Sequence, residues 1–63
     1  MWYVELINDN LAIHFKEFST ELEMYKFLWE GLIVKNISGI SSYFYYYDDG
    51  SLMKLAGYGK YRS

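Results

Sequence analysis

Five consecutive aromatic residues at positions 43–47 constrain the fold of this chain more than any other segment. They precede an Asp-Asp-Gly sequence, which is typical of a tight turn between two strands. Successive side chains of a strand point to opposite faces of its sheet. Phe44 and Tyr46 therefore share one face, and the other face takes Tyr43, Tyr45 and Tyr47. The core can take up one of these two sets, so the other set must form part of the surface.

The turn predicts a hairpin with strands over residues 41–47 and 51–56. With a two-residue loop, Phe44 lies opposite Leu55, and the large apolar side chains of both strands gather on one face. With a three-residue loop and the glycine in a bulge, Phe44 lies opposite Lys54 instead. We favour the two-residue loop because it keeps the apolar side chains together, and the three-residue loop stays open as the alternative.

Length and composition indicate how such a chain can be stable. The 63 residues include no cysteine, and 52% of them are hydrophobic. A chain of this length forms a single domain, here over residues 1–63. It can form neither a disulfide nor a thiolate metal site, so its stability must come from apolar packing or from self-association.

A second hairpin is predicted near the start of the chain. Residues 2–7 and 11–16 alternate between apolar and other side chains, and the Asn-Asp-Asn sequence between them is typical of a turn. A two-residue loop places Leu6 opposite Ile13 and gathers the large apolar side chains on one face, whereas a three-residue loop would mix the faces. We therefore predict the two-residue register.

Residues 21–30 predict an amphipathic helix. Thr20 fits the N-cap of a capping box, in which the Glu23 side chain reaches back to the N-cap backbone. Gly31 fits the left-handed residue that commonly ends a helix. One face of the helix carries the apolar side chains of Leu22, Met24, Tyr25, Leu28 and Trp29.

The remaining segments complete the predicted fold. Residues 32–37 are mostly apolar and predict a strand that ends at Ser38-Gly39, while the glycines at 57 and 59 predict a loosened end and a frayed tail to Ser63. The order is then β-β-α-β-β-β, an α+β fold with one amphipathic helix packed on a mostly antiparallel sheet. The predicted core consists of Val4, Leu6, Ile13, Phe15, Leu22, Tyr25, Leu28, Trp29, Phe44, Tyr46, Met53 and Leu55.

The sequence offers little for catalysis or for binding a metal or a cofactor. His14 is the only histidine, and the predicted register places Glu5 opposite it, as an exposed cross-strand pair rather than an acid–base pair. Asp48 and Asp49 belong to the turn, and a calcium loop would need further ligands and a distal glutamate. We therefore expect a chain that is not an enzyme and that holds no metal and no cofactor.

Neither a leader sequence nor a membrane span is expected. No basic segment is followed by a long apolar one, and no apolar stretch approaches the roughly 20 residues that a membrane span needs. We therefore expect a cytoplasmic protein that does not enter a membrane.

The tyrosine set of the aromatic run is the candidate binding surface. In the favoured register, Tyr45 lies opposite Lys54 and Tyr47 lies beside Leu52. Tyrosine gives a large contact area at low entropic cost, and it is enriched in protein interfaces. We therefore predict a surface that binds another protein, or a second copy of this chain as a homodimer, made of Tyr43, Tyr45, Tyr47, Leu52 and Lys54.

Single-stranded nucleic acid is the alternative partner for the same face, because unpaired bases stack on aromatic side chains. The net charge of −2 argues against it, because nucleic-acid-binding domains usually carry a basic surface. Short, cysteine-free, acidic and aromatic-rich chains of this kind resemble the accessory and inhibitor proteins of phages and mobile elements. The resemblance implies an inhibitor or regulator and assigns no role to any residue.

Overall fold

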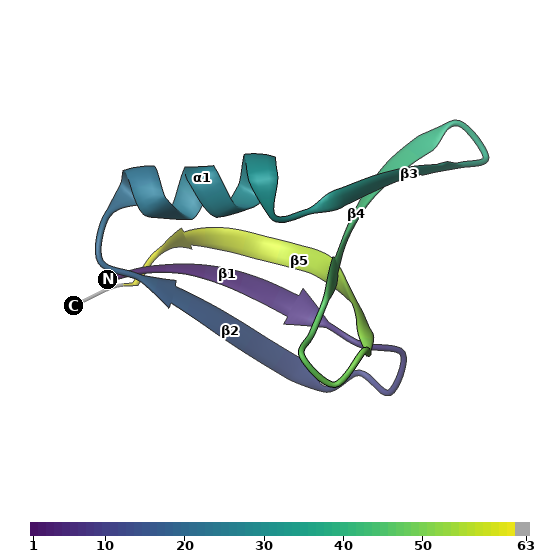
Figure 1. Cartoon of the computed structure of the whole chain (residues 1–63), viewed down its shortest axis with the longest axis horizontal. Coiled ribbons are helices and arrows are strands. Elements are labelled where there is room, and N and C mark those ends of the chain that lie inside the picture. Colours follow the sequence, from purple (N-terminus) through teal and green to yellow (C-terminus); the bar gives the residue numbers. More distant parts are fainter. Residues whose placement is uncertain (62–63) are drawn as a thin grey trace.

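A computed structural model describes residues 1–61 and has the predicted α+β order. The elements are β1 (Trp2–Ile7), β2 (Ile13–Phe18), α1 (Glu21–Glu30), β3 (Ile33–Ile37), β4 (Ile40–Tyr46) and β5 (Leu52–Lys60). All neighbouring strands are antiparallel, and they form one five-stranded sheet in the order β2-β1-β5-β4-β3. The helix packs along one face of this sheet, which we call the helix-covered face; the opposite side is the helix-free face (Figure 1).

The helix has the predicted bounds, and its two ends are fixed in different ways. Thr20 has extended backbone angles, and its Oγ1 accepts a hydrogen bond of 3.2 Å from the Glu23 backbone N–H. The prediction of a left-handed Gly31 is wrong, because its φ is −90° and its ψ is −17°. Glycine is required there for space: a Cβ would lie 2.8 Å from the Phe27 carbonyl oxygen.

The first hairpin has a wider loop than predicted. Leu6 pairs with His14, so residues 8–12 form the connection. The Oδ1 of Asn8 accepts hydrogen bonds of 2.9 Å from the backbone N–H groups of Asn10 and Ala12, and these bonds stabilise the longer loop. The shift of register moves Ile13 and its neighbours to the opposite face from the one predicted.

The second hairpin adopts the alternative register. Phe44 pairs with Lys54, and the Gly50 N–H donates a hydrogen bond of 2.8 Å to the Tyr47 carbonyl oxygen. Gly50 has a φ of +86°, as the bulge residue of a three-residue loop requires. The Asp49 carboxylate accepts hydrogen bonds from Ser51 that hold the loop in this form.

Four side chains, Val4, Leu6, Met24 and Met53, are almost completely buried between α1 and the sheet. Tyr25, Leu28 and Leu55 pack against this core as predicted, and so does Phe27, which sequence reasoning placed on the flank of the helix. The prediction omitted Met24, although the residues that pack inward follow it at the helical spacings of three and four.

Several predicted core residues lie outside it. Leu22 is 75% exposed and Trp29 is 78% exposed, because both project from the side of α1 away from Met24. The register shifts account for the other core residues that were wrongly predicted, which lie on the helix-free face: Ile13, Phe15, Phe44 and Tyr46.

The third hairpin turns at Ser38 and Gly39, where the sequence predicts a break, and both residues have positive φ. The last strand, by contrast, does not loosen at its glycines but continues to Lys60 and pairs with β1. The Tyr3 ring lies over the strand at Gly59, where a Cβ would be 3.7 Å from the ring, an ordinary van der Waals contact. The predicted fraying of residues 62 and 63 lies outside the described residues.

Candidate interaction surface

The pair of residues considered for acid–base chemistry is separated by the sheet. Glu5 pairs with Phe15, and His14 pairs with Leu6, so the two side chains lie on opposite faces. The predicted cross-strand pair of Glu5 and His14 is therefore wrong. The His14 ring instead lies with its centroid 5.0 Å from that of Tyr47.

One acidic residue of the turn, Asp49, has a structural role. Hydrogen bonds from the Ser51 hydroxyl and backbone N–H hold the pKa of the Asp49 carboxyl below its ordinary value of 3.8. Among residues 1–61, no three His, Cys, Asp or Glu side chains are grouped so that they could hold a metal ion.

The five predicted partner-binding residues do not form one surface. Tyr45 and Tyr47 lie half-buried on the helix-covered face, where they pack against the core. The Lys16 ammonium lies 4.9 Å from the Tyr45 ring centroid and 5.0 Å from that of Tyr47, and the Tyr45 ring is 5.1 Å from the Phe27 ring. These two tyrosines therefore support the fold.

The other three predicted residues divide between two regions. Leu52 and Lys54 lie on the helix-free face, opposite Tyr46 and Phe44 in the ladder. Tyr43 lies on the helix-covered face of the sheet and is 42% exposed. The alternation of the aromatic run is as predicted, but the assignment of its two sets to core and surface is reversed.

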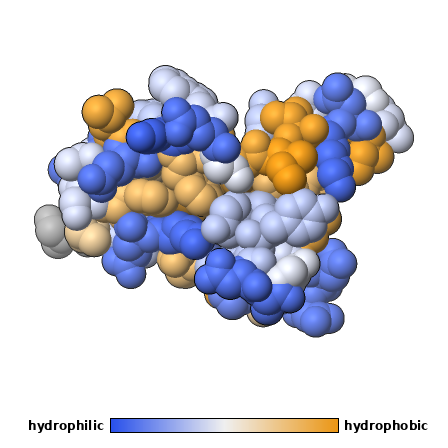
Figure 2. Space-filling model, viewed as in Figure 1, coloured by the Kyte–Doolittle hydropathy of each residue, from blue (hydrophilic) through white to orange (hydrophobic). Residues whose placement is uncertain are grey.

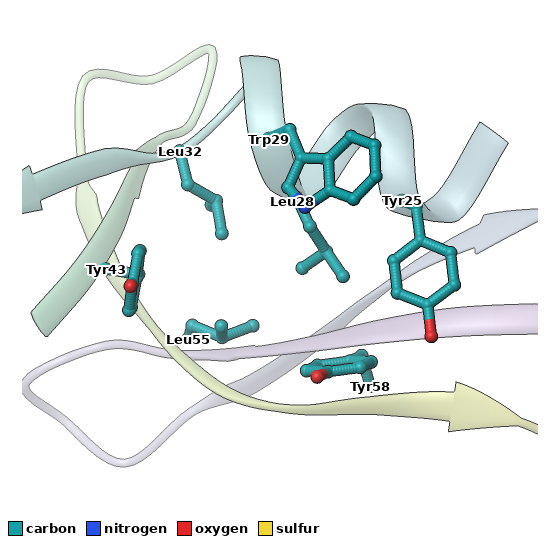
Figure 3. Close-up of a pocket in the computed structure, with 7 residues that line it drawn as sticks. All are labelled: Tyr25, Leu28, Trp29, Leu32, Tyr43, Leu55 and Tyr58. Carbon is teal, nitrogen blue, oxygen red and sulfur yellow. The ribbon is translucent and has the colours of Figure 1, made fainter. Parts of the chain in front are cut away.

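Tyr43 belongs to an apolar groove of about 240 Å³ between α1 and the sheet. The Tyr25 ring lies 5.8 Å from that of Trp29 and 6.3 Å from that of Tyr58. Figure 3 shows side chains of the helix and of the sheet meeting around this space. The groove is lined by Tyr25, Leu28, Trp29, Leu32, Tyr43, Leu55 and Tyr58. The sequence did not predict this groove, because Trp29, which lines it, was expected in the core.

The helix-free face carries many apolar side chains beside the charged side chains of Glu5, Glu17 and Lys54. A sheet side that faces water normally carries polar residues at alternate positions. Here the Tyr3 ring contacts Phe15 and Tyr61, with centroid distances of 5.8 Å and 4.8 Å. Further apolar side chains extend this face across the sheet: Ile7, Ile13, Phe44, Tyr46 and Leu52.

A projecting ribbon carries several exposed apolar side chains. We define the arm as β3 together with residues 40–43 of β4, which pair with β3 beyond the point where β5 pairs with β4. The arm extends away from the helix and the rest of the sheet (Figure 1), and hydrophobic side chains cover much of its visible side (Figure 2). All of β3 is exposed, Ile37 to 58%, and Ile40 on β4 is 68% exposed.

Comparison of the chain with models of protein families, with curated proteins and with solved structures gave no match. In the described part of the chain, no helix combines the length and apolar character that crossing a membrane requires. The geometry of residues 1–61 is therefore the basis for a functional assignment.

Proposed function

We propose that this chain is a non-enzymatic protein-interaction module that binds a partner protein through the arm and the adjoining helix-free face. The observation that carries the proposal is the exposure of the arm, a two-stranded ribbon on which Ile33, Ile37 and Ile40 share one face and Val34 lies on the other. Exposed apolar side chains gathered in this way commonly mark a site of protein contact.

Burial of this surface would supply a favourable free energy of binding. Removing apolar surface from water contributes about 25 cal/mol per Å², and an isolated two-stranded ribbon is at best marginally stable in water. A partner that covers the arm would therefore gain contact area and also order the ribbon. An inhibitor or regulator acts through such contacts and needs no catalytic group.

Nucleic acid is less well supported as the partner. Ammonium groups of the chain already lie over several rings: Lys35 is 5.6 Å from the Phe44 centroid and Lys60 is 5.7 Å from that of Trp2. These contacts compete with base stacking on the same ring faces. The net charge of −2 adds no general attraction for phosphates.

Capture of partners by matched variants tests the proposal. The whole chain and three variants would be used to recover proteins from native lysate with and without nuclease treatment, with quantification by mass spectrometry. One variant changes the arm (Ile37→Ser with Ile40→Ser), one changes the helix-free face (Phe15→Ser), and the control Leu22→Ser changes an exposed apolar residue of α1. Circular dichroism would establish that all variants are folded.

We expect the parent chain and Leu22→Ser to recover the same protein species, and the arm variant to lose it. Phe15→Ser should weaken the recovery, because its ring belongs to the adjoining face. Equal recovery by all variants would contradict the proposal. Recovery that disappears after nuclease treatment would favour the nucleic-acid alternative.

A further inference from the structure

We propose that the free edge of β3 accepts an extended segment of the partner protein as an added antiparallel strand, with a carboxylate of that segment opposite Lys35. This inference rests on the proposed function and specifies the chemistry of the segment that is bound. Strand addition to an exposed sheet edge is a common mode of peptide recognition.

The backbone of β3 is available for such pairing. β3 is the terminal strand of the sheet, its five residues are all exposed, and it contains no proline. The two-residue turn makes Ile37 and Ile40 the hydrogen-bonded pair that closes the hairpin. By the alternation of an antiparallel ladder, the N–H and C=O groups of Val34 and Asn36 then point away from β4, toward the free edge.

The other edge of the sheet is less suited to an added strand. β2 carries the charged side chains of Lys16 and Glu17 at adjacent positions, one toward each face of the sheet. Charges of this kind commonly protect a sheet edge from pairing. β3 has a single charged residue, Lys35, at its centre.

The side chains of β3 determine which residues the added strand must carry. Ile33, Lys35 and Ile37 lie on one face of the ribbon, at alternate positions. A complementary strand places a carboxylate opposite Lys35 and an aliphatic residue two positions away on each side. Opposite charges and apolar pairs directly across a ladder are both favourable.

The same geometry argues against a second copy of this chain as the occupant. A two-fold antiparallel pairing that uses the outward groups of both Val34 and Asn36 brings Lys35 opposite Lys35 of the second copy. Like charges directly opposite each other destabilise a strand pair. Lys35 therefore disfavours self-association through this edge and favours an acidic partner segment.

Two synthetic peptides test the charge requirement. One is Thr-Val-Thr-Glu-Thr-Val-Thr, and the other has lysine in place of the glutamate. Binding to the parent chain, to Lys35→Glu and to the control Lys26→Glu would be measured by NMR titration. Lys26→Glu makes the same change of charge at an exposed residue of α1, away from the arm and the helix-free face.

We expect the parent chain and Lys26→Glu to bind the glutamate peptide about tenfold more tightly than the lysine peptide, and Lys35→Glu to reverse the preference. Amide hydrogen exchange locates the bound strand: it should slow at Val34 and Asn36, whose N–H groups point outward, and change little at Lys35. Absence of binding by both peptides, equal binding, or slowing confined to β2 would overturn the inference.

The test of strand addition and the test of the proposed function can fail independently of each other. If the partner captured from lysate depends on Ile37 and Ile40 but is unaffected by Lys35→Glu, the arm is an interface and strand addition at this edge is wrong. If the arm variant captures the same proteins as the parent chain, the proposed function itself fails. A parent chain that dimerises through β3 would show a second copy to be the occupant and would also overturn the inference.

Discussion

Tyr45 lies directly opposite Met53, and both side chains are on the helix-covered face of the sheet. This pairing fixes the faces of the whole aromatic run, because side chains alternate along a strand. Tyr43, Tyr45 and Tyr47 therefore point to the side of the helix, and Phe44 and Tyr46 point to the helix-free face. The helix-free face therefore carries the part of the aromatic run that does not pack against the core.

The first prediction concerns the structural role of Tyr45. Its ring packs against Phe27 and beneath the Lys16 ammonium, so Tyr45→Ala should lower the free energy of unfolding by about 2 kcal/mol. Tyr46→Ala, on the opposite face and 50% exposed, is the matched control and should cost less than about 1 kcal/mol. Urea unfolding followed by tryptophan fluorescence measures both. Equal costs would contradict the observed register.

The second prediction concerns the centre of the core. Met24→Ala should destabilise the chain by about 2–5 kcal/mol, because Met24 is 1% exposed and its removal leaves a cavity beneath α1. Leu22→Ala removes a side chain that is 75% exposed and should change stability by less than about 0.5 kcal/mol. Thermal melts followed by circular dichroism distinguish the two. If Leu22→Ala melts as early as Met24→Ala, the face of α1 that packs on the sheet differs from the one described.

The third prediction concerns the bulge at Gly50. An alanine at its φ of +86° would have no steric neighbour, but the conformation itself is unfavourable for an L-residue. Gly50→Ala should therefore cost about 1–2 kcal/mol, and Gly50→Asn should cost less, because asparagine adopts left-handed angles more readily. Chemical denaturation of both variants gives the comparison. No difference in stability from the parent would argue for a loop that lacks the bulge.

The fourth prediction concerns the pH dependence of the same loop. Hydrogen bonds from Ser51 lower the pKa of Asp49 in the folded chain, so their stabilising contribution is fully present above the ordinary pKa of 3.8 and is lost as the pH falls through the lowered value. Ser51→Ala removes the hydroxyl donor and should raise the pKa of Asp49 toward 3.8. An NMR titration of the side-chain carboxyl carbon measures it. An unchanged pKa in Ser51→Ala would rule out the hydroxyl as the cause.

Local signals in the sequence predicted the elements well. Residues 21–30 form the helix as expected, with Thr20 at the N-cap, and the Ser38-Gly39 turn joins two strands. These features depend on residues that are neighbours in the chain, so the sequence carries the relevant interactions directly.

The strand registers were predicted incorrectly because loop chemistry outweighed the grouping of apolar side chains. Asn8 binds two backbone N–H groups and lengthens the first loop, and Gly50 with Asp49 selects a three-residue second loop. Each shift of one residue exchanges the two faces of a strand. The candidate surface followed from those faces, so the error in register carried through to Tyr45 and Tyr47.

Photocrosslinking from the arm tests whether a partner protein binds there. A photoreactive phenylalanine analogue would replace Ile40 on the arm, and in a matched control it would replace Leu22 on α1; both positions are highly exposed. After irradiation in native lysate, mass spectrometry identifies the attached proteins. We expect one protein species to be joined through position 40 and to be absent from the control at position 22. Crosslinking of the same species through both positions, or through position 22 alone, would contradict it.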